Sequence, residues 1–260
     1  MNSSDTRFTS SGPVGRLTFT RPETGNALTW AMYEALADAC DRVDADRGIR
    51  VFVICAPGGV FCTGTDIRQF TTFKTGQDGL EYERRVEACL TRLEGVAVPT
   101  IAQVEGIAAG AGCAIALACD LRVCTAAARF GVPIARTLGN ALSIENCARL
   151  VEHIGPGPTK DMLFTGRLLD AREASALGLV TRLAEPADIG RIVDELAETI
   201  ARNAPLTIRA MKAALRQVSK RQQADVEGVN DLIAACYASH DFREGVAAFL
   251  AKRPPVFTGE

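Results

Sequence analysis

The chain has 260 residues, of which 47% are apolar and 23% charged, the composition of an ordinary globular protein. Its formal net charge of −2 argues against nucleic acid or an anionic membrane surface as the main partner. No apolar run approaches the roughly 18 residues that a membrane span needs, so we expect no membrane insertion. The nine cysteines include no CxxC pair, and the first residues lack the apolar core of a secretory leader. These features favour reduced thiols and a cytoplasmic protein.

The first half of the chain alternates strand-like and helix-like segments. Residues 1–13 are polar and predict a disordered tail, whereas RLTFT (16–20) predicts a strand. A helix is expected from Thr29, which can cap it, to about residue 47, and the apolar run VFVICAP (51–57) predicts a strand buried on both faces. Further elements are expected at 78–94 (helix), 100–106 (strand), 111–118 (helix) and 120–125 (strand). This order favours an α/β layered core built from right-handed crossovers.

After about residue 143 the pattern becomes almost wholly helical. Helices are expected from Ser143 to His153, from Pro158 to before Gly166, and over 170–178, 187–202, 205–219, 225–239 and 243–250. We predict an α/β core over 14–200 and a helical region over 201–260. The apolar stripes of that region must pack on the core or on a neighbouring subunit.

A glycine-rich turn links the strand expected at 100–106 to the helix expected at 111–118. The segment GIAAGAG leaves backbone N–H groups at a helix start, where they suit a negative charge. A dinucleotide fingerprint is poorly matched, because the spacing supplies two of its three glycines and no acidic residue follows a strand about 20 residues later. An oxyanion hole is the other interpretation, and it needs a second donor. The N–H of Thr65, exposed by Gly64 in GGVFCTGTDI, is the candidate.

Two segments together resemble a known family. FCTGTDI (61–67) and EGIAAGAGCAIALACDLRV (105–123) are similar to the signature segments of the crotonase superfamily, which includes the enoyl-CoA hydratases and isomerases. RPETGNAL (21–28), RFGVP (129–133), LFTGRLLDAREASALGLV (163–180) and DFREGVAAFLAKRPPVF (241–257) match in the same order. The resemblance extends from about residue 14 to residue 257.

The resemblance implies a fold of stacked ββα turns, a spiral core, with a helical C-terminal trimerisation region. It also implies an acyl-CoA thioester as ligand, fatty acid metabolism as the setting, and a homotrimer or a dimer of trimers. CoA would be part of the substrate, and neither a separate cofactor nor a metal is expected. The thioester oxygen would be held by the N–H groups of Thr65 and Ala111, which form the implied oxyanion hole.

Further positions are implied to line the acyl-CoA site. They are Thr24, Ala27, Thr63, Asp66, Ile67, Gly110, Ala114, Pro133, Ile134, Arg136, Phe249 and Lys252. Thr24 and Ala27 fall in the CoA channel, and Asp66 and Ile67 fall near the adenine pocket. Phe249 and Lys252 match residues that reach the nucleotide end, often from a neighbouring subunit. For Lys252 a solvated surface charge is the competing interpretation.

The sequence departs from the hydratase pattern at both catalytic glutamates. The resemblance places them at Ala114 and Ile134, where an alkyl side chain can neither accept nor donate a proton. General acid–base help is worth roughly 10²–10⁴-fold per group, so two-glutamate hydration should be severely impaired. Glu145 is the candidate for a relocated acid, although a first-turn carboxylate that stabilises the helix dipole is the simpler interpretation.

Three classes of function remain open. The first is an enoyl-CoA hydratase/isomerase family enzyme, a lyase or isomerase, that forms an enolate; isomerisation, thioester hydrolysis and C–C cleavage are alternatives to hydration. The second is an acyl-CoA-binding protein without catalysis, favoured by the absence of both glutamates. A nucleotide-dependent dehydrogenase is the remaining alternative, and it requires NAD(H) binding.

Overall fold

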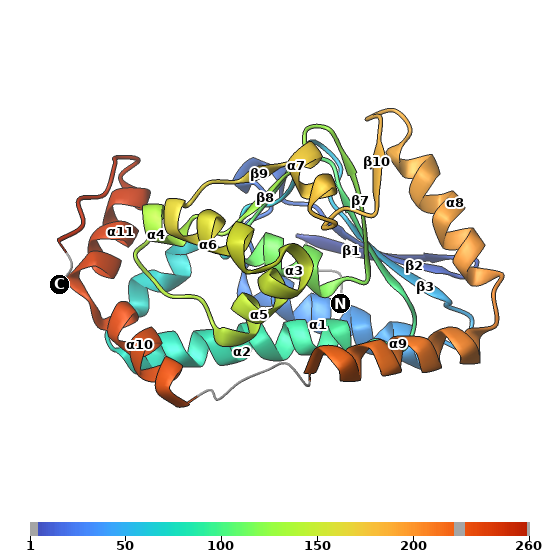
Figure 1. Ribbon diagram of the computed structural model, residues 1–260, viewed down its shortest axis with the longest axis horizontal. Helices are drawn as coiled ribbons and strands as arrows, with labels where there is room; N and C mark the ends of the chain where they lie inside the picture. Colours follow the sequence, from blue (N-terminus) through green and yellow to red (C-terminus); the bar gives the residue numbers. More distant parts are fainter. Residues whose placement is uncertain (1–4, 221–226, 259–260) are drawn as a thin grey trace.

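A computed structural model describes residues 5–220 and 227–258 and shows two β-sheets with helices around and between them (Figure 1). The first sheet has the order β1 (Thr6–Ser11), β2 (Val14–Phe19), β3 (Val51–Cys55), β5 (Thr100–Val104), β7 (Leu121–Thr125) and β10 (Arg182–Ala184). The second has the order β4 (Val60–Cys62), β6 (Ile107–Ala109), β8 (Arg129–Gly131) and β9 (Leu169–Asp170). Only the β1–β2 and β8–β9 pairs are antiparallel among the described strands.

Each turn of the core repeats one order of elements. A strand enters the first sheet, a short strand enters the second, and a helix returns the chain: β3, β4 and α2 (Gly76–Glu94), then β5, β6 and α3 (Ala111–Ala118). β7 and β8 continue the pattern and lead into α4 (Ile134–Thr137) and α5 (Ile144–Ile154). Stacking of these turns confirms the predicted fold of ββα repeats.

The central strand β3 is buried on both faces, which explains its uninterrupted apolar run. Phe52 and Ile54 belong to the main core, which also receives α1 (Trp30–Ala45) and α2. Val51 and Val53 face the opposite side, where α8 (Ile189–Ala201) covers the sheet. Alternate residues of a strand point to opposite faces, so both sets must be apolar.

The predicted disordered tail is wrong for the residues described. Thr6–Ser11 forms strand β1, which pairs antiparallel with β2 over its whole length. This edge strand is mostly exposed, because only one side of it faces the protein. Its polar side chains therefore give no apolar signal, and the backbone hydrogen bonds to β2 hold it in place.

The remaining described helices are α6 (Pro156–Thr165), α7 (Ala171–Ala176), α9 (Pro205–Lys220), α10 (Glu227–Ala238) and α11 (His240–Leu250), with the 3₁₀ turns η1 (Pro22–Thr24) and η2 (Ile67–Thr72). α10 packs along α2, and α11 packs against η2. Ile233, Tyr237 and Phe242 from this region join the main core. The helical C-terminal part therefore completes the core that surrounds the glycine-rich loops. None of the described helices combines the length and the apolar character needed to cross a membrane.

Candidate active site

The two glycine-rich loops predicted from the sequence lie against each other. A methyl group added to Gly64 would lie 3.7 Å from the Ala111 nitrogen and 3.8 Å from the Gly110 Cα. Gly64 has φ 115° and Gly110 has φ 52°, conformations that side-chain-bearing residues rarely adopt. The backbone conformation therefore favours glycine at both positions, and the two loops lie in van der Waals contact with each other.

The backbone around Thr65 directs its N–H away from the segment that contains Leu28. Leu28 N donates to Gly64 O at 2.8 Å, and Asp66 N donates to Leu28 O at 2.9 Å. In this parallel bridge the peptide groups on either side of Thr65 face Leu28, so the Thr65 N–H points the other way. No acceptor for that N–H occurs among the described residues.

Ala111 is the first residue of α3, so its N–H has no partner within the helix. Gly110, the residue before the helix, provides no side chain to cap it. The helix stands close to β4, because a methyl group on Gly112 would lie 2.2 Å from the Cys62 carbonyl oxygen. Two backbone donors, Thr65 N–H and Ala111 N–H, are thus presented by adjoining loops, and the positive end of α3 adds to their effect.

The Thr65 side chain is held in a buried hydroxyl network. Its Oγ1 lies 2.7 Å from Tyr33 Oη and 2.8 Å from Tyr82 Oη. All three residues are buried, and burial raises the pKa of both tyrosine hydroxyls. The network connects the Thr65 peptide to α1 and α2 and fixes the direction of its N–H.

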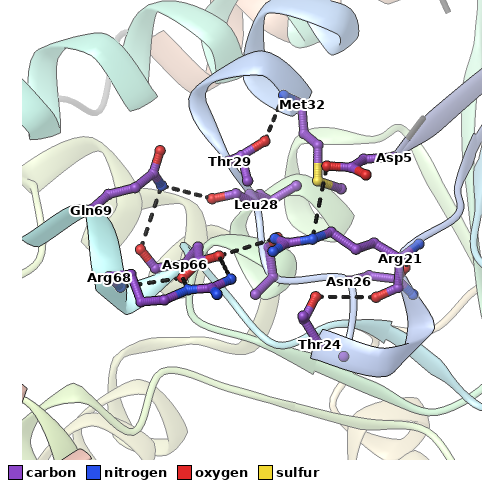
Figure 2. Close-up of polar contacts among 12 residues, drawn as sticks. Asp5, Arg21, Thr24, Asn26, Leu28, Thr29, Met32, Asp66, Arg68 and Gln69 are labelled. Carbon is purple, nitrogen blue, oxygen red and sulfur yellow. Dashed lines mark hydrogen bonds and ion pairs between the residues drawn. The ribbon is translucent and has the colours of Figure 1, made fainter. Parts of the chain in front are cut away.

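Asp66 joins the same loop to the segment that begins at Arg21, as Figure 2 shows. Arg21 Nη1 donates to Asp66 Oδ2 at 3.0 Å and to the Ala27 carbonyl at 2.9 Å. Arg68 Nη2 binds the same carboxylate at 2.6 Å. Hydrogen bonds from Arg68, then from Arg21, lower the pKa of Asp66 to about 2 despite the cost of burial. Asp66 is therefore a permanent carboxylate, unsuited to exchanging protons near neutral pH.

The structure brings most of the other predicted binding positions to these loops. Thr24 closes the turn that begins at Arg21, and its Oγ1 donates to the Arg21 carbonyl at 3.2 Å (Figure 2). Thr63 N donates to Gly25 O at 3.0 Å, which aligns the two segments. Ala27 lies next to Leu28 of the parallel bridge, and Ile67 opens η2 directly after Asp66. These residues lie on the two segments that the Leu28–Thr65 bridge joins.

The positions of the two absent glutamates are apolar in the structure as in the sequence. Ala114 lies one turn into α3 and is buried, and Ala114 N donates to Gly110 O at 3.0 Å. Ile134 follows Pro133 at the start of α4 and packs partly buried against the main core. Arg136, also on α4, is exposed and packs beside Gly166 rather than forming an ion pair with any described residue.

Two predicted positions lie at the end of α11. Phe249 is 53% exposed, and Lys252 follows the helix with a positive φ of 53°. No contact between them and Thr65 or Ala111 is recorded within the described chain. Their predicted role at the nucleotide end of CoA stays a prediction.

Glu145 stands in the first turn of α5, after Ser143, whose side chain caps that helix. It is half-buried and lies close enough to Glu83 of α2 to raise the pKa of that carboxyl. Sequence reasoning did not single out Glu83, Arg21, Tyr33 or Tyr82. Nothing local marks them, because the side chains that they bind in this network, Asp66, Thr65 and Tyr237, lie at least 17 positions away along the chain. The described residues contain no cluster of His, Cys, Asp and Glu able to hold a metal ion.

Comparisons with known proteins agree with this geometry. The sequence profile of the family "Enoyl-CoA hydratase/isomerase" matches residues 9–260. The chain is 34% identical to a putative enoyl-CoA hydratase of Thermus thermophilus over 249 residues, covering 95% of this chain and 98% of that protein. It is 30% identical to human mitochondrial methylglutaconyl-CoA hydratase, over 90% of this chain and 70% of that protein.

Solved structures show the same likeness. The fold is similar to an enoyl-CoA hydratase/carnithine racemase from Magnetospirillum magneticum, with a TM-score of 0.81, 30% identity, and coverage of 100% of this chain and 97% of that one. It is also similar to methylmalonyl-CoA decarboxylase complexed with 2S-carboxypropyl CoA, with a TM-score of 0.91 and 25% identity over 100% of both chains. Sequence, fold and the paired glycine loops lead to one conclusion: the chain belongs to the enoyl-CoA hydratase/isomerase family, within the crotonase superfamily.

Proposed function

We propose that this protein is an acyl-CoA enzyme that forms and stabilises a thioester enolate. The thioester oxygen would accept hydrogen bonds from the N–H groups of Thr65 and Ala111. The observation that carries the proposal is the close approach of the Gly64 and Gly110 loops, each of which offers a backbone donor with no acceptor among the described residues. Loss of one such donor typically costs about 3–4 kcal/mol of transition-state stabilisation.

The CoA portion of the substrate would lie along the edge formed by the loops at 21–28 and 63–67. Thr24, Ala27, Thr63, Asp66 and Ile67 line this edge, and their alignment by the Leu28–Thr65 bridge supports the assignment. Phe249 and Lys252 would contact the nucleotide from a neighbouring subunit in a trimer or a dimer of trimers. A cation there suits a phosphate group.

The reaction we propose is proton transfer next to the thioester carbonyl rather than two-glutamate hydration. Ala114 and Ile134 supply no proton-transfer group, so a mechanism of water addition that uses side chains at both positions is excluded. Double-bond isomerisation needs only one group that takes and returns a proton, and the oxyanion donors stabilise its enolate. The acyl group near the carbonyl would be uncharged, because both of these residues are apolar.

The experiment that tests the proposal is mass spectrometry of saturated and unsaturated acyl-CoA thioesters incubated with the protein in deuterated water. We expect deuterium incorporation, with a shifted double bond for unsaturated substrates. A product whose mass has increased by one water would identify the reaction as hydration instead of isomerisation. Free CoA would identify it as thioester hydrolysis. Thioesters that bind but return without deuterium would contradict the proposal and identify an acyl-CoA-binding protein.

A further inference from the structure

Glu83 is a buried carboxyl group without a cationic partner. It is 8% exposed, and no Lys, Arg or His of the described chain lies within ion-pair distance of it. Tyr237 Oη donates to Glu83 Oε1 at 2.7 Å, and the Ser143 backbone N–H donates to the same carboxyl group. Asp66, the other buried acid, is neutralised by two arginines. Burying an acid without a cation is costly, and such groups are concentrated at functional sites.

The fold places Glu83 between the oxyanion loop and the segment that follows Ile134. Its neighbour on α2, Tyr82, is bonded to Thr65, which carries the first proposed donor. On the other side, Ser143 ends the segment that starts with α4, and Asn140 of that segment donates to Tyr237 Oη at 3.0 Å. Glu83 is thus joined by hydrogen bonds to the segment in which the hydratase pattern expects its second glutamate.

A second buried polar atom lies in this network. Asn140 Nδ2 is bonded to Tyr237, but Asn140 Oδ1 is buried and has no donor among the residues that the structure describes. Buried acceptors are rarely left without a partner, since each costs about 1–3 kcal/mol. A buried acceptor without a partner and a buried carboxyl group are therefore both joined to Tyr237.

The other acids near the loops are engaged elsewhere. Asp120 accepts from Thr100 and Lys212, and Glu105 accepts from Gln103. Asp66 remains ionised. Glu145 is the exception, because its side chain forms no hydrogen bond or ion pair in the described structure, but it is more exposed than Glu83. Glu83 alone among them combines burial, neutral hydrogen-bond partners and proximity to the segments that carry Thr65 and Ile134.

We infer that Glu83 is the acid–base residue of this site, replacing the glutamates that Ala114 and Ile134 have displaced. The inference rests on the proposed function. The Glu83 carboxylate would take a proton from the carbon next to the conjugated system. The C–H electron pair would form a new C=C bond to the β-carbon, the former Cα=Cβ π pair would move into the bond between the α-carbon and the carbonyl carbon, and the carbonyl π pair would move onto the thioester oxygen, held by Thr65 and Ala111. Protonated Glu83 would then return the proton to another carbon of the enolate, which leaves the double bond shifted and the enzyme unchanged.

The electrostatic environment suits this role. Burial raises the pKa of Glu83 to about 7, while the hydrogen bonds from Tyr237 and Ser143 act in the opposite direction. The titratable groups that face it are Tyr82 and Glu87 on α2, Glu145 and Cys147 on α5, and Tyr237 on α10. An acid–base group is most effective when its pKa lies near the working pH.

The test uses butyryl-CoA, a saturated thioester that can exchange α-protons but cannot be hydrated. Exchange in deuterated water is followed by mass spectrometry for the wild type and for Glu83→Gln, which keeps an acceptor for Tyr237 and Ser143. We expect Glu83→Gln to slow exchange by roughly 10²–10⁴-fold. The wild-type rate should rise with pH and level off above about 7, and the variant should lack this step.

A second measurement distinguishes failure of this inference from failure of the proposed function. 4-(Dimethylamino)cinnamoyl-CoA absorbs at longer wavelength when its carbonyl is polarised, so its spectrum reports the two backbone donors without any proton transfer. A red shift retained in Glu83→Gln with slowed exchange supports the inference. Exchange as fast in Glu83→Gln as in the wild type overturns it and leaves the proposed function intact. No red shift and no exchange in the wild type would overturn the proposed function itself.

Two further variants distinguish a proton-transfer role from a structural one. Glu83→Asp keeps the carboxyl group, so it should retain a pH step with a reduced plateau, and it serves if Glu83→Gln fails to fold. Glu145→Gln removes a negative charge that raises the pKa of Glu83, so the step should move to lower pH without disappearing. A step abolished by Glu145→Gln and kept by Glu83→Gln would assign the chemistry to Glu145.

Discussion

At the scale of single residues, the site depends on glycines that permit a backbone conformation, more than on reactive side chains. The proposed contribution of Thr65 and Ala111 is a backbone N–H group from each, which any residue other than proline provides. What must be kept is the direction of each N–H. The positive φ of Gly64, the hydroxyl network of Tyr33 and Tyr82, and the bridge to Leu28 fix that direction for the first donor.

Gly64→Ala should therefore reduce turnover far more than it reduces stability. The φ of 115° is strained for alanine, and relaxation would rotate the Thr65 N–H. We expect a loss of about 10²–10³-fold in kcat, the usual effect of losing one oxyanion donor. Steady-state kinetics with the substrate identified by mass spectrometry measures this. Gly58→Ala is the matched control, because Gly58 has φ 106° and open space around it. Equal losses in both variants would contradict the assignment.

Glu83 should also make stability depend on pH. Its pKa rises from 4.5 to about 7 on folding, so the folded state keeps a proton that the unfolded state has lost. Its contribution is present below pH 4.5 and disappears as the pH rises through 7, a change of about 3 kcal/mol. Urea denaturation of wild type and Glu83→Gln at several pH values isolates this effect. His153, whose pKa is lowered to about 4 by burial, acts in the opposite direction in both proteins and cancels. If the free energies of unfolding of the two proteins change with pH in parallel, Glu83 has an ordinary pKa and the prediction is contradicted.

At the scale of elements, the position of α3 is secured at both ends. Its first turn faces the Gly64 loop, and the carbonyls of its last turn are bound by Arg122 of β7. Arg122 Nη1 donates to Cys119 O at 2.5 Å and to Ala116 O at 3.1 Å, and its Nε donates to Leu179 O at 2.6 Å. A buried cation at the negative end of a helix dipole orients the whole helix.

Arg122→Met should destabilise the protein by about 2–4 kcal/mol. The methionine fills the space but leaves several buried carbonyl oxygens without donors, each of which costs about 1–3 kcal/mol, partly offset by relief of the buried charge. Urea denaturation at pH 7 measures the change. Arg129→Met is the comparison, because Arg129 also donates to two carbonyls but is more exposed. A smaller effect at Arg122 than at Arg129 would show that α3 is held by apolar packing alone.

The sequence predicts elements well where burial leaves a pattern. The α1 helix begins after Thr29 as its capping and apolar spacing predict, and β3 coincides with its apolar run. The strands of the second sheet have only two or three residues, too few for any periodicity, and none was predicted as a separate element. Edge strand β1 gives no signal because its side chains face solvent.

The same reasoning explains what could be predicted of the site. Each glycine loop can be predicted from its composition. The contact between the two loops depends on the stacking of two turns of the core, which no local pattern predicts. Glu83 lies in GLEYERR, between the exposed residues Glu81 and Arg84, and therefore resembles part of a solvated helix face. It is buried by Tyr237, which is 154 positions away, so no local pattern distinguishes it.

At the scale of the whole molecule, α9 directs two of its basic residues inward. Lys212 Nζ donates to Val98 O at 2.9 Å and to Asp120 Oδ2 at 2.6 Å, and Arg216 Nη2 donates to Thr91 O at 3.2 Å. Met211, Leu215 and Val218 share another face of the helix and are 53%, 68% and 61% exposed. An apolar helix face directed at solvent is typical of a surface that another subunit covers.

Leu215→Glu should therefore weaken the proposed association of copies. A charge at the centre of this face would have to be buried without a partner, so we expect a shift from trimer or hexamer to monomer. Light scattering coupled to size-exclusion chromatography measures the mass. Arg209→Glu, on the same helix but outside the apolar face, is the control. A wild-type protein that elutes with the mass of one chain would contradict the proposed assembly.

α9 bonds basic residues to its own subunit and exposes apolar ones, so the fold of the subunit does not depend on assembly. Because bonds from Lys212 and Arg216 attach the helix to its own subunit, α9 needs no neighbour to stay in place. A subunit released from the proposed assembly by dilution would keep its fold. Met211, Leu215 and Val218 would then form an exposed apolar patch that can bind other chains. Loss of protein at low concentration should then take the form of aggregation of folded chains, visible as turbidity before any change in helical content.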